Sequence, residues 1–242
     1  MRDLLPYSNN RIDNAGKILR RSLAGEQPAP STDEVVEARL IVERFRSVHV
    51  ASMQAARRGL ASCVRDAGLD AEISQRLKRM PTIGDKLTRV QRRLSTLVDL
   101  GGCRAILTNQ EDVYRVRDCF VQNSLRRNGQ EDTVIDYVTL PRESGYRAVH
   151  IHTKFYGRRI EVQLRTSWQQ LWAKYVEDLT GWSGIDFKNG EGPEGVLLSL
   201  RHLSEGLTQL EEGGFTDAAL VEEISHLLRA AASAIVQVVS DL

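Results

Sequence analysis

Two neighbouring segments within residues 136–166 carry side chains that could bind and activate an anionic substrate. At the strand period of two, one face of each segment is polar and the other is apolar. The polar faces carry Tyr146, His150, His152, Arg159, Glu161, Gln163 and Arg165. A half-solvated sheet also alternates polar and apolar residues, but its polar face rarely combines these groups so densely. The pattern predicts a sheet face that holds an anionic nucleotide.

Two carboxylates stand out among the basic residues of the central region. Asp99 precedes the segment LGGCR, where we expect a strand to begin, and Glu161 lies in the middle of the second polar segment. A carboxylate pair beside arginines suggests Mg²⁺ shared with substrate phosphates. One carboxylate could also act as general base for a sugar hydroxyl. Spacing alone leaves a simpler interpretation open, in which both carboxylates pair with neighbouring arginines.

Phosphate binding would have to rest on side chains, because the sequence contains neither a GxxxxGKS or GxxxxGKT motif nor a GxGxxG motif. Basic residues are frequent around the two polar segments. The candidates are Arg76, Lys78, Arg79, Lys86, Arg104, Arg142, Arg147 and Arg165. Any one of them could be a solvated surface charge. Their joint occurrence favours phosphate binding, since guanidinium groups pair with phosphate oxygens and stack on bases.

The two histidines and the tyrosine have more than one interpretation. His150 and His152 lie two apart on one strand, so both could face one metal ion. No cysteine or third histidine lies nearby to complete a zinc site, so we expect hydrogen bonds to phosphate or to a neighbour. Tyr146 offers a flat face for stacking a base, although a single tyrosine is more often a packed sheet residue.

The bulk composition is that of a globular protein. The chain has 242 residues, 41% of them hydrophobic, and no apolar run long enough to span a membrane. Residues 1–175 carry 30 Lys and Arg against 20 Asp and Glu, whereas residues 176–242 carry 3 against 12. A basic body favours phosphorylated ligands or nucleic acid. The N-terminus lacks the apolar core of a signal peptide, and three scattered cysteines argue against zinc and against disulfides, so we predict a cytoplasmic protein.

The order of the expected elements predicts an α+β fold, with a mixed sheet between N-terminal and C-terminal helices. Expected helices cover part of 1–30, then 34–67 as one long or broken helix, 70–79, 82–94, 109–125, 166–181, 193–211 and 217–239. Expected strands are 102–108, 133–138, 146–155 and 159–165. Thr166 and Gln169 form a capping-box pattern. Apolar positions of the two tail helices fit a core, but they could also bind a second subunit or another protein.

Four segments, in order, resemble the synthetase domain of RelA/SpoT proteins: RLKRMPTIGDKL, DLGGCRAIL, DYVTLPRESGYRAVH and IEVQLRTSWQQLWAKYVE. The resemblance covers residues 70–182 and implies a synthetase core there, flanked by helical regions at 1–69 and 183–242. The family uses Mg²⁺ and transfers the β,γ-pyrophosphate of ATP to a ribose 3′-hydroxyl. The resemblance therefore implies a pyrophosphokinase with ATP as donor and GDP or GTP as acceptor.

The resemblance also assigns site residues. On the ATP side it implies Arg76, Lys78, Lys86 and Arg104. Asp99 and Glu161 would hold the metal, with Glu161 also beside the attacking hydroxyl. Tyr146 would stack the acceptor base. The remaining acceptor-side residues would be Arg142, Arg147, His150, Gln163 and Arg165.

Two further segments, LPYSNNRIDNAGKILRR and RFRSVHVASMQAARRGL, resemble toxic small alarmone synthetases of toxin–antitoxin and phage-defence systems. Some enzymes of that group modify the 3′ CCA end of tRNA, so the acceptor stays open. Lys17, Arg20 and Arg21 would suit a tRNA backbone, or they could be a solvated helix face. The resemblance to toxin–antitoxin systems makes an antitoxin protein a candidate partner, and the apolar tail helices leave a homo-oligomer open.

A second class of function is a non-catalytic regulator that binds nucleotides on the same fold. Such a module would be expected to lose the metal carboxylates or the stacking tyrosine. Asp99, Tyr146 and Glu161 are all present, which favours the enzyme.

Overall fold

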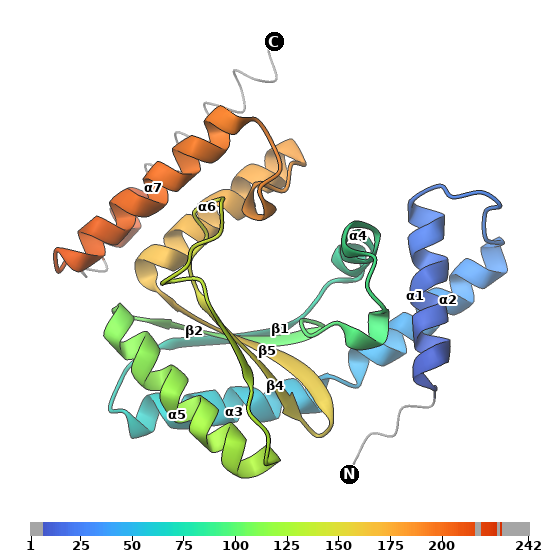
Figure 1. The fold of residues 1–242 in the computed structure, drawn as a ribbon, viewed down its shortest axis with the longest axis horizontal. Coiled ribbons are helices and arrows are strands. Elements are labelled where there is room, and N and C mark those ends of the chain that lie inside the picture. The colour runs from blue at the N-terminus through green and yellow to red at the C-terminus, as the bar shows by residue number, and fades with distance from the viewer. Residues whose placement is uncertain (1–6, 216–218, 227, 229–242) are drawn as a thin grey trace.

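The computed structural model describes residues 7–215, 219–226 and 228. A five-stranded mixed sheet lies between helices, so the predicted α+β class is confirmed (Figure 1). The strands are β1 (Glu72–Leu77), β2 (Gly101–Leu107), β3 (Thr133–Asp136), β4 (Val149–Phe155) and β5 (Arg158–Thr166). The α-helices are α1 (Asn9–Leu23), α2 (Thr32–Ser47), α3 (Val50–Asp66), α4 (Met80–Val90), α5 (Gln110–Asn128), α6 (Ser167–Ser183) and α7 (Glu194–Glu212). Two 3₁₀ turns are η1 (Leu94–Thr96) and η2 (Phe187–Asn189).

The strand order is β1-β2-β5-β4-β3, which places β5 at the centre of the sheet. Strands β2 and β5 are parallel, and every other neighbouring pair is antiparallel. Parallel pairing requires a crossover connection, and the chain between β2 and β5 contains α5 and the β3–β4 hairpin. The expected hairpin between β4 and β5 is confirmed, with Phe155 paired to Arg158.

The two faces of the sheet differ as the period-two pattern predicts. The apolar face packs against α3 and α5, which lie side by side beneath the sheet in Figure 1. Its central side chains are fully buried: Val149, Ile151, Ile160, Val162 and Leu164. The polar face points toward the opposite side, between α6 on one flank and α4 with α1 on the other.

Two further hydrophobic clusters flank that polar face. One joins α1, α2, α4 and η1, with Ile12, Leu87 and Leu94 at its centre. The other joins α6, α7 and η2 around Trp168 and Trp172. The Trp172 Nε1–H donates to the Leu200 carbonyl at 2.9 Å, so a buried polar atom ties α6 to α7.

The predicted helix at 70–79 is wrong, because Glu72–Leu77 is the edge strand β1. Ile73 and Leu77 both pack on the apolar core, and their spacing of four residues fits one face of a helix or of a strand. Pairing with β2 decides between them, and pairing cannot be read from this segment alone.

The other elements expected before residue 213 are confirmed with changes at their ends. The helix expected at 34–67 is broken at Val48 and His49, which separate α2 from α3. The strand expected from residue 146 begins at Val149, so Tyr146 lies in the loop before β4. The helix expected at 82–94 ends at Val90.

The expectation that the cysteines form no disulfide is wrong. Cys63 of α3 and Cys119 of α5 are joined by a disulfide, with their Cα atoms 5.7 Å apart. The two residues are separated by 56 positions in sequence, and they meet because both helices cover the same face of the sheet. Cys103 is a buried free thiol.

Part of the expected tail lies outside the described residues. Residues 219–226 are helical, whereas most of the remainder of the predicted helix at 217–239 is not described. Among the described helices, none combines the length and the apolar character that crossing a membrane would need.

The capping box of α6 gives a test of how this helix is anchored to β5. The Thr166 hydroxyl accepts from the Gln169 amide at 3.3 Å, and the Gln169 side chain accepts from the Thr166 amide at 3.2 Å. We expect Thr166→Ala to lower the free energy of unfolding by about 1 kcal/mol or more, because it removes a buried N-cap. Urea unfolding measures the change. Thr166→Ser is the control, and equal stability of the alanine variant and the wild type would contradict the role of the cap.

Candidate active site

Strand register places polar side chains in rows across one face of the sheet. In the first row Arg76 is paired with Gly102, Gly102 with Glu161, and Glu161 with His152. Paired residues on neighbouring strands direct their side chains to the same face. Because Gly102 has no side chain, the surface between Arg76 and Glu161 is left open.

The second row lies one pleat repeat away on the same face. Arg104 is paired with Gln163, and Gln163 with His150. The two rows together bring residues from β1, β2, β4 and β5 onto one surface. Residues as far apart in the sequence as Arg76 and Gln163 therefore lie on one surface, as the predicted polar sheet face requires.

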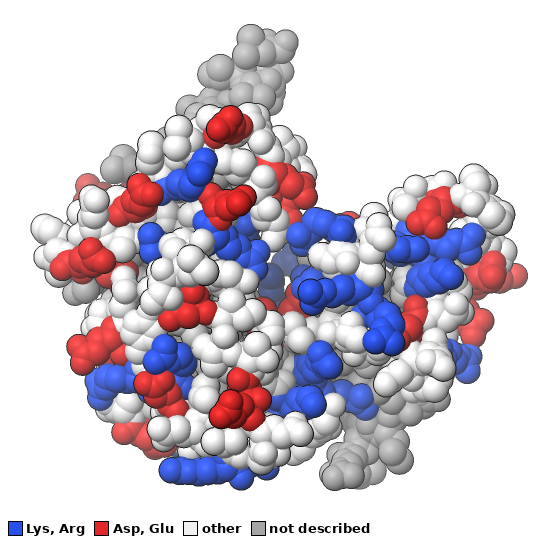
Figure 2. Space-filling view, viewed as in Figure 1, with Lys and Arg blue, Asp and Glu red and all other residues white. Residues whose placement is uncertain are grey.

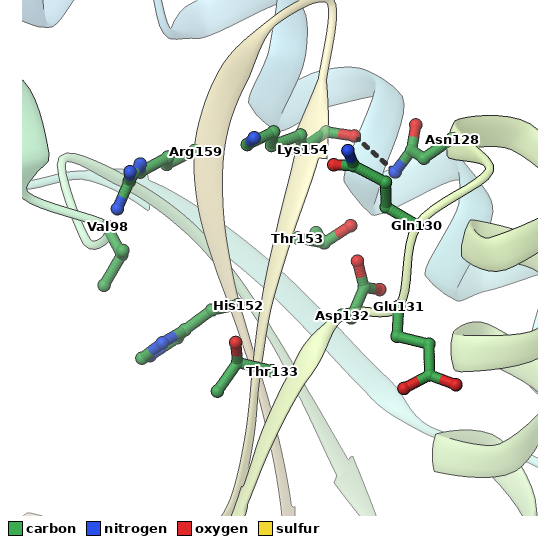
Figure 3. A pocket seen from close by; sticks show the side chains of 10 residues that line it. All are labelled: Val98, Asn128, Gln130, Glu131, Asp132, Thr133, His152, Thr153, Lys154 and Arg159. Atoms are coloured by element: carbon green, nitrogen blue, oxygen red, sulfur yellow. Dashed lines mark hydrogen bonds between the residues drawn. The ribbon is translucent and has the colours of Figure 1, made fainter.

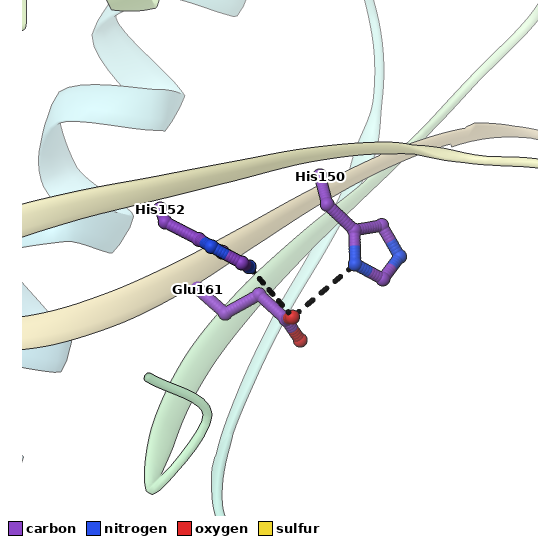
Figure 4. Close-up of side chains that lie close together, drawn as sticks. All are labelled: His150, His152 and Glu161. Carbon is purple, nitrogen blue, oxygen red and sulfur yellow. Dashed lines mark hydrogen bonds and ion pairs between the residues drawn. The ribbon is translucent and has the colours of Figure 1, made fainter. Parts of the chain in front are cut away.

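Glu161 lies at the centre of this surface, and three side chains converge on its carboxylate. Its Oε1 is 3.2 Å from His150 Nδ1 and 3.4 Å from His152 Nε2 (Figure 4). The Gln163 amide donates to Oε2 at 2.6 Å. Burial would raise the pKa of Glu161, but the hydrogen bonds from His150, His152 and Gln163 hold it well below its usual value. Glu161 is therefore ionised at neutral pH, and the expected hydrogen bonds of the two histidines to a neighbour are confirmed.

Asp99 lies at the start of β2, between two lysines. Its Oδ2 accepts from Lys86 Nζ at 2.6 Å and from Lys78 Nζ at 3.1 Å. Burial would raise the pKa of Asp99, but the two ammonium groups outweigh burial and lower the pKa. The nearby charge of Glu161 acts in the opposite direction. Asp99 is thus an ionised carboxylate within electrostatic reach of Glu161.

The donor atoms of this surface fit a hard divalent cation. Asp99 Oδ1 is buried and has no hydrogen-bond partner within the described part of the chain. Glu161 supplies a second carboxylate within electrostatic reach of Asp99, and its strand neighbour Gly102 has no side chain. Carboxylate oxygens together with substrate phosphates are the usual ligands of Mg²⁺.

A buried hydrogen-bond network continues from Glu161 toward α6. The other nitrogen of His150, Nε2, lies 2.6 Å from the Tyr146 hydroxyl. Arg165, which is fully buried, donates to that hydroxyl at 2.6 Å and to the Gln163 side-chain oxygen at 3.1 Å. The network fixes the orientation of His150 and Gln163, since each side chain bonds Glu161 with one atom and a second partner with another.

Tyr146 is fully buried, and cationic groups cover its ring. Lys188 Nζ lies 4.8 Å from the ring centroid, the Arg165 guanidinium 5.0 Å and the Arg142 guanidinium 5.4 Å. Tyr137 packs edge-on against it. A base could stack on Tyr146 only after at least one of these groups has moved.

Lys188 belongs to η2 and was not anticipated from the sequence, because it lies outside the segments that carry the family resemblance. Burial and the neighbouring Arg165 lower its pKa to about 8, although the Glu177 carboxylate 3.4 Å away favours the charged form. Asp186 of the same segment lies 3.8 Å from Arg89 of α4. The η2 segment therefore reaches from the tyrosine to the α4 side of the surface.

Two other residues support the site without having been predicted. The side-chain oxygen of Gln170, in the first turn of α6, accepts from Arg104 at 3.0 Å and from Arg165 at 3.1 Å. Arg46 of α2 donates to the Lys78 carbonyl at 2.6 Å. The capping box places Gln170 in the first turn of a helix that directly follows the polar strand, so the sequence could have indicated its position beside the site. Nothing in the sequence around Arg46 indicates its contact with Lys78.

Four of the predicted site residues lie elsewhere. Arg147 donates to the Val138 carbonyl and to Ser204 of α7, and so contacts the helical flank. Lys17, Arg20 and Arg21 lie on α1. Lys17 and Arg20 line a cavity of about 440 Å³ between α1 and the end of α4, together with Arg92 and Arg93. Arg20 and Arg21 also face Glu26, and the Arg21 side chain donates to the Pro28 carbonyl.

The charge distribution agrees with a site for anions. Figure 2 shows a notch between the lobe of α6 and α7 and the lobe of α1, α2 and α4, with Lys and Arg along its walls. Asp99 lies between Lys78 and Lys86, and both Asp99 and Glu161 are ionised. The arrangement can hold a polyphosphate and a divalent cation together.

Comparison with known proteins agrees with this arrangement. Residues 75–180 match the model of the region found in RelA/SpoT proteins. The uncharacterised protein Rv1366 of Mycobacterium tuberculosis is 28% identical over 197 residues, which are 78% of this chain and 64% of that protein. The chain therefore spans about 64% of the length of this relative. GTP pyrophosphokinase YjbM of Bacillus subtilis is 26% identical over 155 residues, 58% of this chain and 68% of that protein.

The fold is found in solved structures. Small alarmone synthetase 1 from Bacillus subtilis superimposes with a TM-score of 0.54 and 22% identity, covering 75% of this chain and 97% of that chain. The same enzyme bound to its product pppGpp gives a TM-score of 0.52 and 21% identity over 71% of this chain and 94% of that chain. Residues 75–180 therefore carry the region found in RelA/SpoT proteins, and the fold is that of the small alarmone synthetases.

Proposed function

We propose that this protein is a Mg²⁺-dependent pyrophosphokinase that transfers the β,γ-pyrophosphate of ATP to the ribose 3′-hydroxyl of a guanine nucleotide. The observation that carries the proposal is the pair of ionised carboxylates on the polar sheet face, Asp99 between Lys78 and Lys86, and Glu161 within its electrostatic reach. The name of the Bacillus relative, GTP pyrophosphokinase, supports the same reaction class.

The reaction needs positioning and charge neutralisation rather than a covalent enzyme intermediate. The 3′-oxygen of the acceptor forms a bond to the β-phosphorus of ATP, and the bond from that phosphorus to the α,β-bridging oxygen breaks, so AMP leaves. A Mg²⁺ ion held by Asp99 and Glu161 would neutralise charge on the transferred phosphates. The proton of the hydroxyl passes to Glu161, whose carboxylate is ionised and buried beside the open position at Gly102.

On the ATP side, the basic residues are placed to hold phosphates. Lys78 and Lys86 now pair with Asp99, and we expect both ammonium groups to turn to the ATP phosphates when the nucleotide binds. Arg76 is exposed on the same face, and Arg104 lies one row away.

On the acceptor side, Tyr146 is the proposed platform for the guanine base. Because Arg142 and Lys188 cover the ring, the base has to replace one of these contacts, and the displaced cation then lies beside the nucleotide. Gln163 and Arg165 keep Glu161 and Tyr146 in fixed relative positions.

A second candidate acceptor is the 3′ end of tRNA, which some of the toxic small alarmone synthetases that the sequence resembles modify. The cavity beside α1 favours it, since four basic side chains line its wall: Lys17, Arg20, Arg92 and Arg93. Such a surface suits an RNA backbone. A role as growth-inhibiting toxin, with an antitoxin partner, stays a prediction from the sequence resemblance, as does the alternative of a non-catalytic regulator.

The two carboxylates give the first test. Glu161→Gln and Asp99→Asn should each lower the rate of pyrophosphate transfer by about 10²- to 10⁴-fold, because each removes a charge that acts at the reacting phosphates. Thin-layer separation of products from γ-labelled ATP measures the rate. Glu111→Gln, on α5 at the far face of the sheet, is the matched control. Full activity in both site variants would contradict the assigned roles, and ATP binding without turnover in wild type would favour the regulator.

The acceptor is identified by supplying γ-labelled ATP with GDP, GTP or bulk tRNA in separate reactions. We expect label in the guanine nucleotide. If only tRNA is labelled, the guanine-nucleotide assignment is wrong, and Lys17→Glu with Arg93→Glu should then reduce labelling. The same double variant is expected to leave labelling of GDP unchanged, because both residues lie on the α1 side, away from Tyr146.

Lys188 gives a prediction about pH. Its pKa in the folded protein is about 8, below the usual 10.5, so the unfolded chain binds the proton more tightly. The free energy of unfolding should therefore rise with pH between these two values, by about 3 kcal/mol at most, relative to Lys188→Met. Urea unfolding of both proteins at pH 7 and pH 10 measures the difference. If the difference in free energy of unfolding between wild type and Lys188→Met is the same at both pH values, the pKa of Lys188 is not lowered by folding.

A further inference from the structure

Three nitrogen and oxygen donors converge on one point of the polar sheet face. His150 Nδ1 and His152 Nε2 both face Glu161 Oε1, at 3.2 and 3.4 Å, and the ligand atoms of the three residues lie within 4.8 Å of one another (Figure 4). Two ligands bound tetrahedrally at about 2.0–2.1 Å from a metal are about 3.4 Å apart. The spacing of each histidine from the glutamate therefore matches that of ligands around a single ion.

The sheet holds these donors in place before any ion binds. His152 lies directly opposite Glu161 in the pairing of β4 with β5, and His150 lies two residues away on the same strand face. The Tyr146 hydroxyl is 2.6 Å from His150 Nε2, which orients Nδ1 toward Glu161. The Gln163 amide donates to Glu161 Oε2 and leaves Oε1 to the histidines. Partners of this kind orient metal ligands and raise their affinity.

The donor types select the class of ion. Mg²⁺ prefers oxygen ligands, whereas two imidazoles with one carboxylate suit Zn²⁺ and its first-row neighbours. Thiolates that would compete are absent from the described residues, since Cys63 and Cys119 form a disulfide and burial raises the pKa of Cys103 to about 12.

An ion can reach the site from solvent. His152 lines a cavity of about 240 Å³ at the edge of the sheet, and Figure 3 shows its ring on the same side of the strands as Arg159 and Val98. Its side chain is 23% exposed, compared with 8% for His150. His152 is therefore the ligand that an entering ion would meet first.

We propose that His150, His152 and Glu161 form a site for a transition-metal dication of the Zn²⁺ class, and that an ion bound there withholds Glu161 from pyrophosphate transfer. The inhibitory part rests on the proposed function, whereas the binding part does not. Zn²⁺ in this position occupies the carboxylate that the transfer reaction needs, and it leaves Asp99 with its lysine partners.

The binding test uses the full-length, tag-free protein titrated with Co²⁺, whose visible absorption reports imidazole and carboxylate coordination, followed by displacement with Zn²⁺. We expect one Co²⁺ per chain. His152→Ala should weaken binding by more than about 100-fold, because even the loss of an outer partner costs about 10- to 100-fold. His202→Ala, an exposed histidine of α7, is the matched control and should bind as wild type does. Equal binding by His152→Ala and wild type, or no absorption in wild type, would overturn the proposal.

The inhibitory part is tested by pyrophosphate transfer in excess Mg²⁺, with each protein compared with its own zinc-free rate. Micromolar Zn²⁺ should inhibit wild type and His202→Ala, and should inhibit His152→Ala far less. Equal inhibition of all three proteins would contradict the assignment to this site. If wild type shows no transfer activity at all, the proposed function fails while the Co²⁺ result stands on its own.

Discussion

The central constraint on this fold is the register of β5. Three of its alternate residues, Ile160, Val162 and Leu164, are fully buried against the helices beneath the sheet. A shift of one residue would bury Glu161 and Gln163 and expose that apolar row. The burial of three aliphatic side chains thus fixes the face on which the polar side chains emerge. The positions of Gly102, Arg104, His150 and His152 follow, because they are set by pairing with β5.

Buried charge is the second constraint, and each buried carboxylate of the site lies beside cationic or hydrogen-bonding partners. Asp99 is neutralised by two lysines, Glu161 is satisfied by three hydrogen-bond donors, and Glu177 pairs with Lys188. Isolated buried charges are costly, so a site of this density is stable only when each carboxylate has a partner. The same pairing accounts for the cations that cover Tyr146 and Asp99. Under the proposed function, a nucleotide would therefore bind by exchanging partners with these cations.

The sequence predicts much of this arrangement, and the failures have identifiable causes. Alternation along residues 146–165 is enough to separate the two faces, and the capping box at Thr166 places the start of α6. Residues 72–77 were misassigned because Ile73 and Leu77 satisfy either period, and only pairing with β2 distinguishes them. The disulfide and Lys188 depend on contacts between residues 11 to 56 positions apart, which no local pattern contains. Sequence spacing shows that His150 and His152 share a strand face, but the approach of Glu161 to both depends on pairing of β4 with β5.

Helix α4 has different neighbours on its two sides. Lys86 reaches Asp99 on the sheet side, while the next residue, Leu87, packs in the cluster with α1 and lines the basic cavity. Successive residues of one helix thus face two different surfaces. The polar sheet face and the cavity beside α1 share α4 as a common wall.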